Sequence, residues 1–479
     1  MSNAVAKEPI DPQLAKIATV LIVGALAVVF DTTIVSVALH TLAKDLNASV
    51  ATIQWVSTGF LLALGIAIPL AGWAQARFGG KRVWMFALVV FLIGSIACSL
   101  AWSAASLIAF RALQGFGGGL MLPLLATIIV QAAGGKSLGR IMSAISLPTA
   151  LGPILGPVVG GLILGALDWR WLFWVNIPFC VVGFMLAWRI LPKDDATARP
   201  KLDWLGFILL SPGFVGILYG LSNAGKTNGF ARGDVLVPLI AGVALIVVFA
   251  LYAIRKGEGA LVDVRLLRHR PVWSASVMLF LSGASLYGAM LLLPLYWQEV
   301  RGFDALGAGL LLAPQGIGAL VSRFFAGRLT DSIGAKAVAI VGFLVVGLAT
   351  VPFAFVTATT GQWWLMTVLV VRGFGLGAVL VPLMTVAYIG LDRSEIPHAS
   401  IITRIVQQIG GSFGVALLAV ILEGSLVNVG HGATLAAGFD TAFWWAAGFT
   451  ALGVVVAFAL PTKARVKATV KEALPVSPR

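Results

Sequence analysis

The chain has 479 residues, of which 59% are apolar and 11% are charged, and its formal charge is +14. Soluble proteins have roughly 45–50% apolar and about 25% charged residues, so this composition excludes a soluble globular protein. The two cysteines, Cys98 and Cys180, lie in apolar runs and give no basis for a disulfide framework or a Cys/His metal site. We therefore expect a polytopic membrane protein that holds no metal and no organic cofactor.

Apolar stretches dominate the chain from end to end. A helix needs about 20 residues to cross about 30 Å of hydrocarbon. Fourteen stretches meet this length: 17–39, 53–75, 83–101, 106–132, 141–167, 171–191, 204–223, 235–255, 272–297, 305–327, 337–356, 363–390, 399–423 and 438–460. Lipid offers no hydrogen-bond partner to an open backbone, so we predict an all-α bundle of fourteen transmembrane helices.

The first helix carries Asp31, the only acid well inside any predicted span. A buried ionisable group costs about 2.5–3.5 kcal/mol on insertion scales, which makes Asp31 a functional candidate for proton coupling. The fourth helix carries Arg111. A rise of 1.5 Å per residue places Asp31 about 12 Å and Arg111 about 8–9 Å inside the same face, so we expect the side chains to meet. The alternatives are a purely structural ion pair and an Arg111 that reaches out to the interface.

Basic residues are distributed unevenly between the two sides of the membrane. With both termini on one side, 24 of the 33 Lys and Arg fall on that side, 5 on the other and 4 within helices. The positive-inside rule then places both termini in the cytoplasm. The cationic loops are explained by anionic lipid, so we expect no nucleic-acid partner.

Two short sequence motifs each occur twice in the chain. The segment 72–81, after the second helix, is similar to 327–336, which lies 255 residues later. The segment 115–119 is similar to 373–377, which lies 258 residues later. We therefore predict a six-helix half at 1–192, a linker with two extra helices at 193–271, and a second six-helix half with a tail at 272–479. Repeated halves around a midplane site are typical of secondary transporters that work by alternating access.

Several segments carry a family resemblance. They are 31–39 in the first helix, the loop 72–82 (motif A), 111–119 (motif B), 152–161 (motif C), 169–178 and 298–302. Together and in this order they resemble the fourteen-helix drug:proton antiporters of the major facilitator superfamily. The resemblance implies a bacterial inner-membrane exporter driven by the proton gradient. It also implies that Arg111 modulates proton uptake and that Gln114 acts as a hydrogen-bonding relay.

The chain departs from that family pattern at four positions. Ala76 replaces the usual acid of motif A, and Phe60 replaces a common Tyr, whereas Arg323 and Arg404 lie in helices where the pattern has no Arg. The substrate range can therefore differ from that of common members.

Glycine and charged turn residues suggest moving parts. Motif C repeats small residues at a four-residue spacing that permits close helix contact, with prolines beside them: Gly152, Pro153, Gly156, Pro157 and Gly160. We expect a face on which the two halves seal or slide, and simple tight packing is the alternative.

The motif A loops supply a candidate cytoplasmic gate: Gly72, Gly79, Lys81, Arg82 and, in the second copy, Asp331. A plain topology signal is the alternative for this loop.

Polar residues within the helices are candidates for a central substrate cavity. They are Gln54, Trp297, Gln298, Gln315, Gln407 and Gln408. Helix–helix hydrogen bonding is the alternative for each of them. The roles of Arg323, Arg372 and Arg404 toward the substrate stay open.

The predicted function is export of small lipophilic compounds, including drugs, in exchange for protons. One deep acid does not suit dications, so we expect neutral or monocationic substrates and a protein that acts as a monomer. The alternatives are an exporter of an endogenous lipid or metabolite, and a non-transporting membrane sensor.

Two sequence patterns resemble enzyme motifs. A phosphate-loop pattern at 220–227 lies at a helix end, and a nucleophile-elbow pattern at 410–414 lies inside a helix. Neither has the strand context that its chemistry needs, so we predict no enzyme activity.

Overall fold

The computed structural model describes residues 11–134, 138–193, 200–224, 229–357, 359–427 and 435–462. This part of the chain is helical and has no strand. The first half comprises α1 (Pro12–Ile34), α2 (Leu39–Asp45), α3 (Val50–Ala67), α4 (Leu70–Phe78), α5 (Gly80–Ser99), α6 (Ala104–Ala133), α7 (Leu138–Ala166), α8 (Trp171–Trp174) and α9 (Asn176–Ile190). The extra helices are α10 (Trp204–Ala224) and α11 (Gly233–Lys256). The second half comprises α12 (Arg270–Leu295), α13 (Ala305–Ile333), α14 (Ala335–Thr350), α15 (Gln362–Ala387), α16 (Ile396–Val427) and α17 (Leu435–Ala457).

The described residues account for twelve or thirteen of the fourteen predicted membrane spans. Twelve described helices are long and apolar enough to cross a membrane, and the pair α3 and α4 makes thirteen if it counts as one bent span. This pair bends by 51° between Ala67 and Leu70. The bend falls at Pro69, whose ring removes a backbone donor and breaks the helix that we expected to run unbroken over 53–75. The expected span 141–167 corresponds to α7, where several side chains lie outside the described part.

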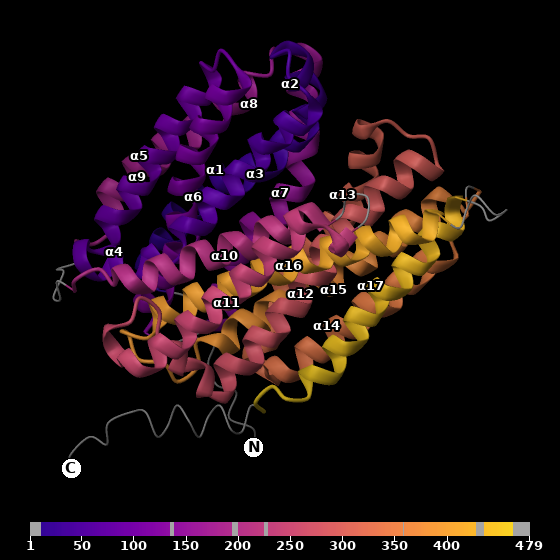
Figure 1. The fold of residues 1–479 in the computed structure, drawn as a ribbon. Helices are drawn as coiled ribbons and strands as arrows, with labels where there is room; N and C mark the ends of the chain where they lie inside the picture. The colour runs from indigo at the N-terminus through magenta and orange to yellow at the C-terminus, as the bar shows by residue number, and fades with distance from the viewer. Residues whose placement is uncertain are drawn as a thin grey trace.

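The two halves form separate bundles, coloured indigo to purple and orange to yellow in Figure 1. Glycines hold neighbouring helices close inside each bundle. A Cβ added at Gly115 of α6 would collide with the Phe60 carbonyl oxygen of α3, and one at Gly373 of α15 would collide with the Gln315 carbonyl oxygen of α13. The same close approach therefore recurs in both halves, at the repeated glycine strings.

Contacts between the halves gather at one end of the bundles. Asp331 of α13 accepts a hydrogen bond of 3.1 Å from the backbone N–H of Gly139 at the start of α7. On the other side of the interface, the Ser400 hydroxyl of α16 donates to the Pro123 carbonyl of α6 at 2.9 Å. Gln131, near the end of α6, donates to the Arg393 carbonyl at 2.9 Å. This is the end to which the cationic loops of the sequence belong.

The extra helices are tied together by one buried acid. Asp203 precedes α10 and accepts hydrogen bonds of 2.7 Å from both Tyr252 and Lys256 of α11. Backbone N–H groups of Gly206 and Leu261 complete its shell. Burial raises the pKa of this carboxyl, but the four donors outweigh burial, so its pKa lies below the ordinary value.

Candidate proton site and central helices

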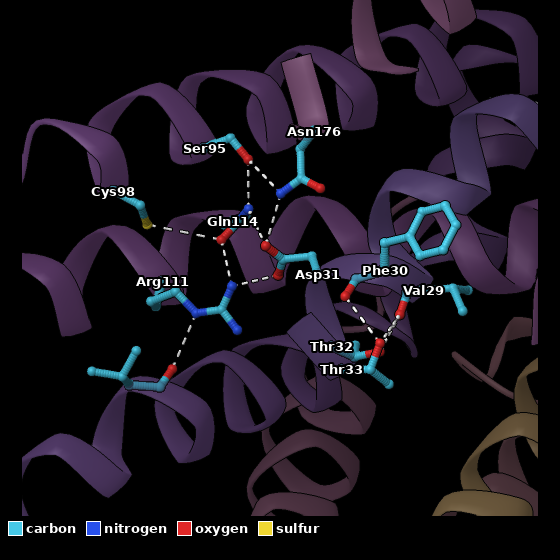
Figure 2. A network of polar contacts seen from close by, with 11 residues as sticks. Val29, Phe30, Asp31, Thr32, Thr33, Ser95, Cys98, Arg111, Gln114 and Asn176 are labelled. Carbon is cyan, nitrogen blue, oxygen red and sulfur yellow. Dashed lines mark hydrogen bonds and ion pairs between the residues drawn. The ribbon is translucent and has the colours of Figure 1, made fainter. Parts of the chain in front are cut away.

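Asp31 is fully buried in the first half and lies against Arg111. Arg111 Nη1 donates both to Asp31 Oδ2 and to Gln114 Oε1, the latter at 2.7 Å. Gln114 Nε2 in turn donates to Asp31 Oδ1 at 2.9 Å. Figure 2 shows these three side chains meeting between α1 and α6, as the sequence predicts.

Two further polar side chains complete the cluster, and sequence reasoning did not single them out. Asn176 Nδ2, at the start of α9, donates to Asp31 Oδ1 at 2.9 Å. Ser95 of α5 accepts from Gln114 at 2.6 Å and from Asn176 at 3.2 Å (Figure 2). Both residues are fully buried. A polar residue alone in an apolar run is the only sequence signal for either, and many helix contacts share that signal.

Small residues and aromatic rings position the cluster. A Cβ at Gly94 of α5 would lie 2.8 Å from backbone atoms of Gln114, so only glycine lets α5 and α6 approach this closely. Arg111 Nε donates to the Val56 carbonyl of α3 at 3.2 Å, and its guanidinium lies 4.1 Å from the Phe60 ring centroid. Phe60, a departure from the family pattern, therefore packs on the cation of the site.

The cluster joins a cation and two amides to one buried acid. Asp31 accepts hydrogen bonds from Arg111, Gln114 and Asn176. Asn176 Oδ1 is buried and has no hydrogen-bond partner among the described residues. The cluster therefore places an ionisable group and spare hydrogen-bonding capacity inside the first half.

The second half holds a buried cation in α15. Arg372 of α15 is 1% exposed and donates to Gln315 Oε1 at 2.6 Å, to Thr350 Oγ1 at 3.0 Å and to the Ser285 carbonyl at 3.3 Å. All three of these partners are neutral. Gln315 is therefore engaged by Arg372 rather than free, which favours the alternative of a helix–helix contact for this candidate.

Arg323 and Arg404 lie in α13 and α16 of the second half. Arg323 of α13 donates through Nη1 to the Ser146 carbonyl of α7, so it joins the two halves. Arg404 of α16 has a buried Nε with no partner in the described part of the chain. One turn along α16, Gln407 is 7% exposed and its Oε1 also lacks a described partner, and its neighbour Gln408 is partly buried.

The remaining cavity candidates differ in their exposure. Gln54 of α3 is exposed, and Gln298 is partly buried in the short π-helix that follows α12. Trp297 is fully buried, 5.9 Å from the Phe303 ring centroid, within an apolar cluster of the second half. A substrate cavity shared by the six candidates therefore stays a prediction.

Motif C packs inside the first half. A Cβ at Gly152 would collide with Val29, and one at Gly156 with Thr33, both on α1. The Thr33 hydroxyl also donates to the Gly152 carbonyl at 3.0 Å. In this conformation the glycine face packs α7 against α1, which favours the alternative of tight packing for Gly152 and Gly156, and a face that seals or slides stays a prediction. Gly160 is buried, and the side chains of Pro153 and Pro157 lie outside the described part.

The candidate gate residues of the first copy contact either their own half or the second half. Gly79 has φ 87° and is the N-cap residue of α5, and Lys81 Nζ donates to the carbonyls of Trp188 and Leu191 at the end of α9, at 2.6 and 2.7 Å. Gly72 of α4 lies against Ile401 of α16 in the second half. Lys81 thus docks on a helix C-terminal end, as expected, but within its own half.

The second copy of the loop crosses between the halves. Asp331 contacts Gly139 and lies 3.7 Å from Arg140 Nε of the first half. Its counterpart in the first copy, Ala76, is exposed and has no carboxylate to offer. Arg82 is also exposed. The two gate loops are therefore unequal, and only the second has an acid on the interface.

Comparisons with known proteins agree with this architecture. The Major Facilitator Superfamily model matches residues 21–415. A multidrug resistance protein B homolog of Mycobacterium tuberculosis is 36% identical over 415 residues, which are 86% of this chain and 77% of that protein. A lincomycin resistance protein of Bacillus subtilis is 30% identical over 394 residues, 82% of each chain.

Among solved structures, a proton:xylose symporter shares the fold. Its TM-score is 0.64 at 16% identity, with 95% of this chain and 98% of the symporter covered. A human organic anion transporter, MFSD10, gives the same TM-score at 15% identity, with 93% and 100% covered. Within the described residues, no group of three or more His, Cys, Asp or Glu is placed to hold a metal ion. The chain is a multi-pass membrane protein that belongs to the Major Facilitator Superfamily of transporters, and its relatives include multidrug and lincomycin resistance proteins.

Proposed function

We propose that this protein exports small lipophilic compounds in exchange for protons by alternating access. The observation that carries the proposal is the buried Asp31 cluster, an acid inside a membrane helix with both a cation and neutral amides as partners. A proton that enters from outside neutralises Asp31, favours release of the substrate and permits the return of the two halves.

The position of the contacts between the halves supports alternating access. Hydrogen bonds such as Gly139 to Asp331 and Ser400 to Pro123 hold the halves together at the end that carries the cationic loops. With that end in the cytoplasm, this is a conformation closed to the cytoplasm. We also propose that α7 completes fourteen spans, with both termini cytoplasmic, in the inner membrane of a bacterium.

Resistance relatives and the charges of the helices support the substrate class. The relatives are named for multidrug and lincomycin resistance, which suggests drug-like compounds. Asp31 is a single negative charge, and it can serve a proton or a monocation but not both at once. We therefore propose neutral or monocationic substrates, and we expect a matched monocationic dye to be exported faster than its dicationic analogue. Equal or faster export of the dication would contradict this substrate class.

The test is transport in vesicles of known composition. The purified protein is reconstituted, a proton gradient is imposed, and a panel of lipophilic compounds is followed across the membrane. We expect movement of at least one compound against its gradient, abolished when a protonophore collapses the proton gradient. Binding of compounds without any proton-dependent flux would instead support the sensor alternative. Proton-driven movement of a labelled phospholipid alone would support the lipid exporter.

A further inference from the structure

An apolar groove runs along the outside of the first half near its cationic end. It has a volume of about 430 Å³ and lies between α4, α5 and α6. Its walls include Leu70, Trp73, Ala74, Phe86, Phe116 and Leu120. This volume is within the range of about 300–1,000 Å³ that is typical of small-molecule sites. The groove is therefore large enough for a ligand, and its walls suit a hydrocarbon.

The groove opens toward the bilayer. Phe78 and Phe86 line it and are 45% and 56% exposed. On a membrane-spanning bundle, exposed rings of this kind face lipid tails. An acyl chain can therefore enter the groove sideways from the leaflet without crossing water.

One cation, Arg82, stands among the residues that line the groove. It is exposed, and it makes no hydrogen bond or ion pair with any residue that the structure describes. Its neighbours differ: Arg77 donates to the Pro200 carbonyl at 3.1 Å, and Lys81 to two carbonyls at the end of α9. Arg82 is thus the cation that remains available to a ligand.

We propose that this groove binds an anionic phospholipid, with an acyl chain against α4 and α6 and the phosphate paired with Arg82. A guanidinium presents several N–H donors that match phosphate oxygens. An exposed cation also favours anionic lipid over a neutral or cationic compound. The substrates of the proposed function are neutral or monocationic, so Arg82 argues against the groove as their entry route.

The lipid site belongs to one half only. The repeat places Ala337 where the first copy has Arg82, so the second half lacks the cation. The α4 wall of the groove also bears Gly72, which packs on Ile401 of α16 in the other half. A bound lipid therefore supports α4 in the position in which it contacts the second half.

The probe is phosphatidylglycerol that carries a photoreactive group in its acyl chain, added to the full-length protein in phosphatidylcholine vesicles. We expect the label on peptides that contain Trp73, Phe86 or Phe116. Arg82→Gln should reduce labelling about fivefold, the effect of about 1 kcal/mol for one basic residue near anionic lipid. Arg268→Gln, which removes an exposed cation that does not line the groove, should leave labelling unchanged.

Three results would overturn the proposal. They are equal labelling by the matched phosphatidylcholine probe, unchanged labelling of Arg82→Gln, and an equal loss in Arg268→Gln. None of these readouts depends on a proton gradient or on substrate. A failure of the proposed transport function therefore leaves the lipid result interpretable, and a failure of the lipid site leaves the transport proposal intact.

Discussion

Asp31 keeps a carboxylate inside a bilayer because donors from three other side chains surround it. Arg111 supplies charge, and Gln114 and Asn176 supply neutral N–H groups to the same carboxylate. Removal of a neutral donor should disturb the orientation of Asp31 without removing the ion pair. Asn176 is therefore a positioning residue, and its effect should appear in the rate of proton-driven transport rather than in substrate binding.

Asn176→Ala should slow proton-driven efflux about tenfold while an exported compound still binds, because it removes a hydrogen bond of about 1.5 kcal/mol to Asp31 and leaves the ion pair with Arg111 in place. The measurement is initial efflux from vesicles under an imposed proton gradient, beside equilibrium binding of the same compound. Asn223→Ala is the matched control, since that side chain donates to the Tyr219 carbonyl of its own helix α10. Wild-type efflux in Asn176→Ala would remove Asn176 from the site.

The sequence predicted the three central residues of this cluster but not the two polar side chains that surround them. Asp31, Arg111 and Gln114 stand out because a charge or amide deep in an apolar helix is costly. Ser95 and Asn176 come from α5 and α9, and only the packing of four helices brings them together (Figure 2). Periodicity within one helix cannot give the rotation of that helix against its neighbours.

At the scale of elements, glycine decides how closely helices pack. Gly115→Ala should lower stability by about 1–3 kcal/mol, because the added methyl would strike the Phe60 carbonyl oxygen. Thermal unfolding in detergent measures the change. Gly165→Ala is the control, since nothing lies within 4 Å of a Cβ added there. Equal melting temperatures for the two variants would show that α3 and α6 do not depend on this contact.

Asp203 should matter for the packing of α10 against α11. Asp203→Asn leaves Lys256 without its anion and should destabilise the protein by about 1–2 kcal/mol near neutral pH, because Lys256 is partly solvated. The pKa of Asp203 is lowered in the folded protein, so its stabilisation is full above the ordinary carboxyl range. That stabilisation is lost as the pH falls below about 4.

The measurement for Asp203 is thermal unfolding of the wild type and of Asp203→Asn at neutral and acidic pH. The gap in melting temperature should narrow as the pH falls. A gap that stays constant down to acidic pH would show that the charge of Asp203 contributes nothing.

The helices could be predicted from the sequence, but a break within one helix and the partner of another could not. Each of the fourteen apolar stretches contains a helix, since length and hydropathy alone determine that. The break at Pro69 was missed because proline is tolerated in membrane helices, and its effect depends on the neighbours. The place of motif C against α1 was missed because a small-residue face fits any close partner.

At the scale of the whole molecule, the fourteen-span topology gives a direct prediction. A reporter fused after Arg479 should be cytoplasmic, and one inserted near Asn228, between α10 and α11, should be external. Both positions are tested in intact cells with a reporter that is active on one side only. Two reporters on the same side would contradict the span count and the proposed orientation.

The central claim is that Asp31 carries the proton that drives export. The most direct measurement compares wild type and Asp31→Asn in the same vesicles, with an imposed proton gradient and, separately, by equilibrium binding of an exported compound. We predict that Asp31→Asn inserts and folds, retains binding and loses gradient-driven efflux, because an amide never titrates. Efflux at the wild-type rate in Asp31→Asn would contradict the account.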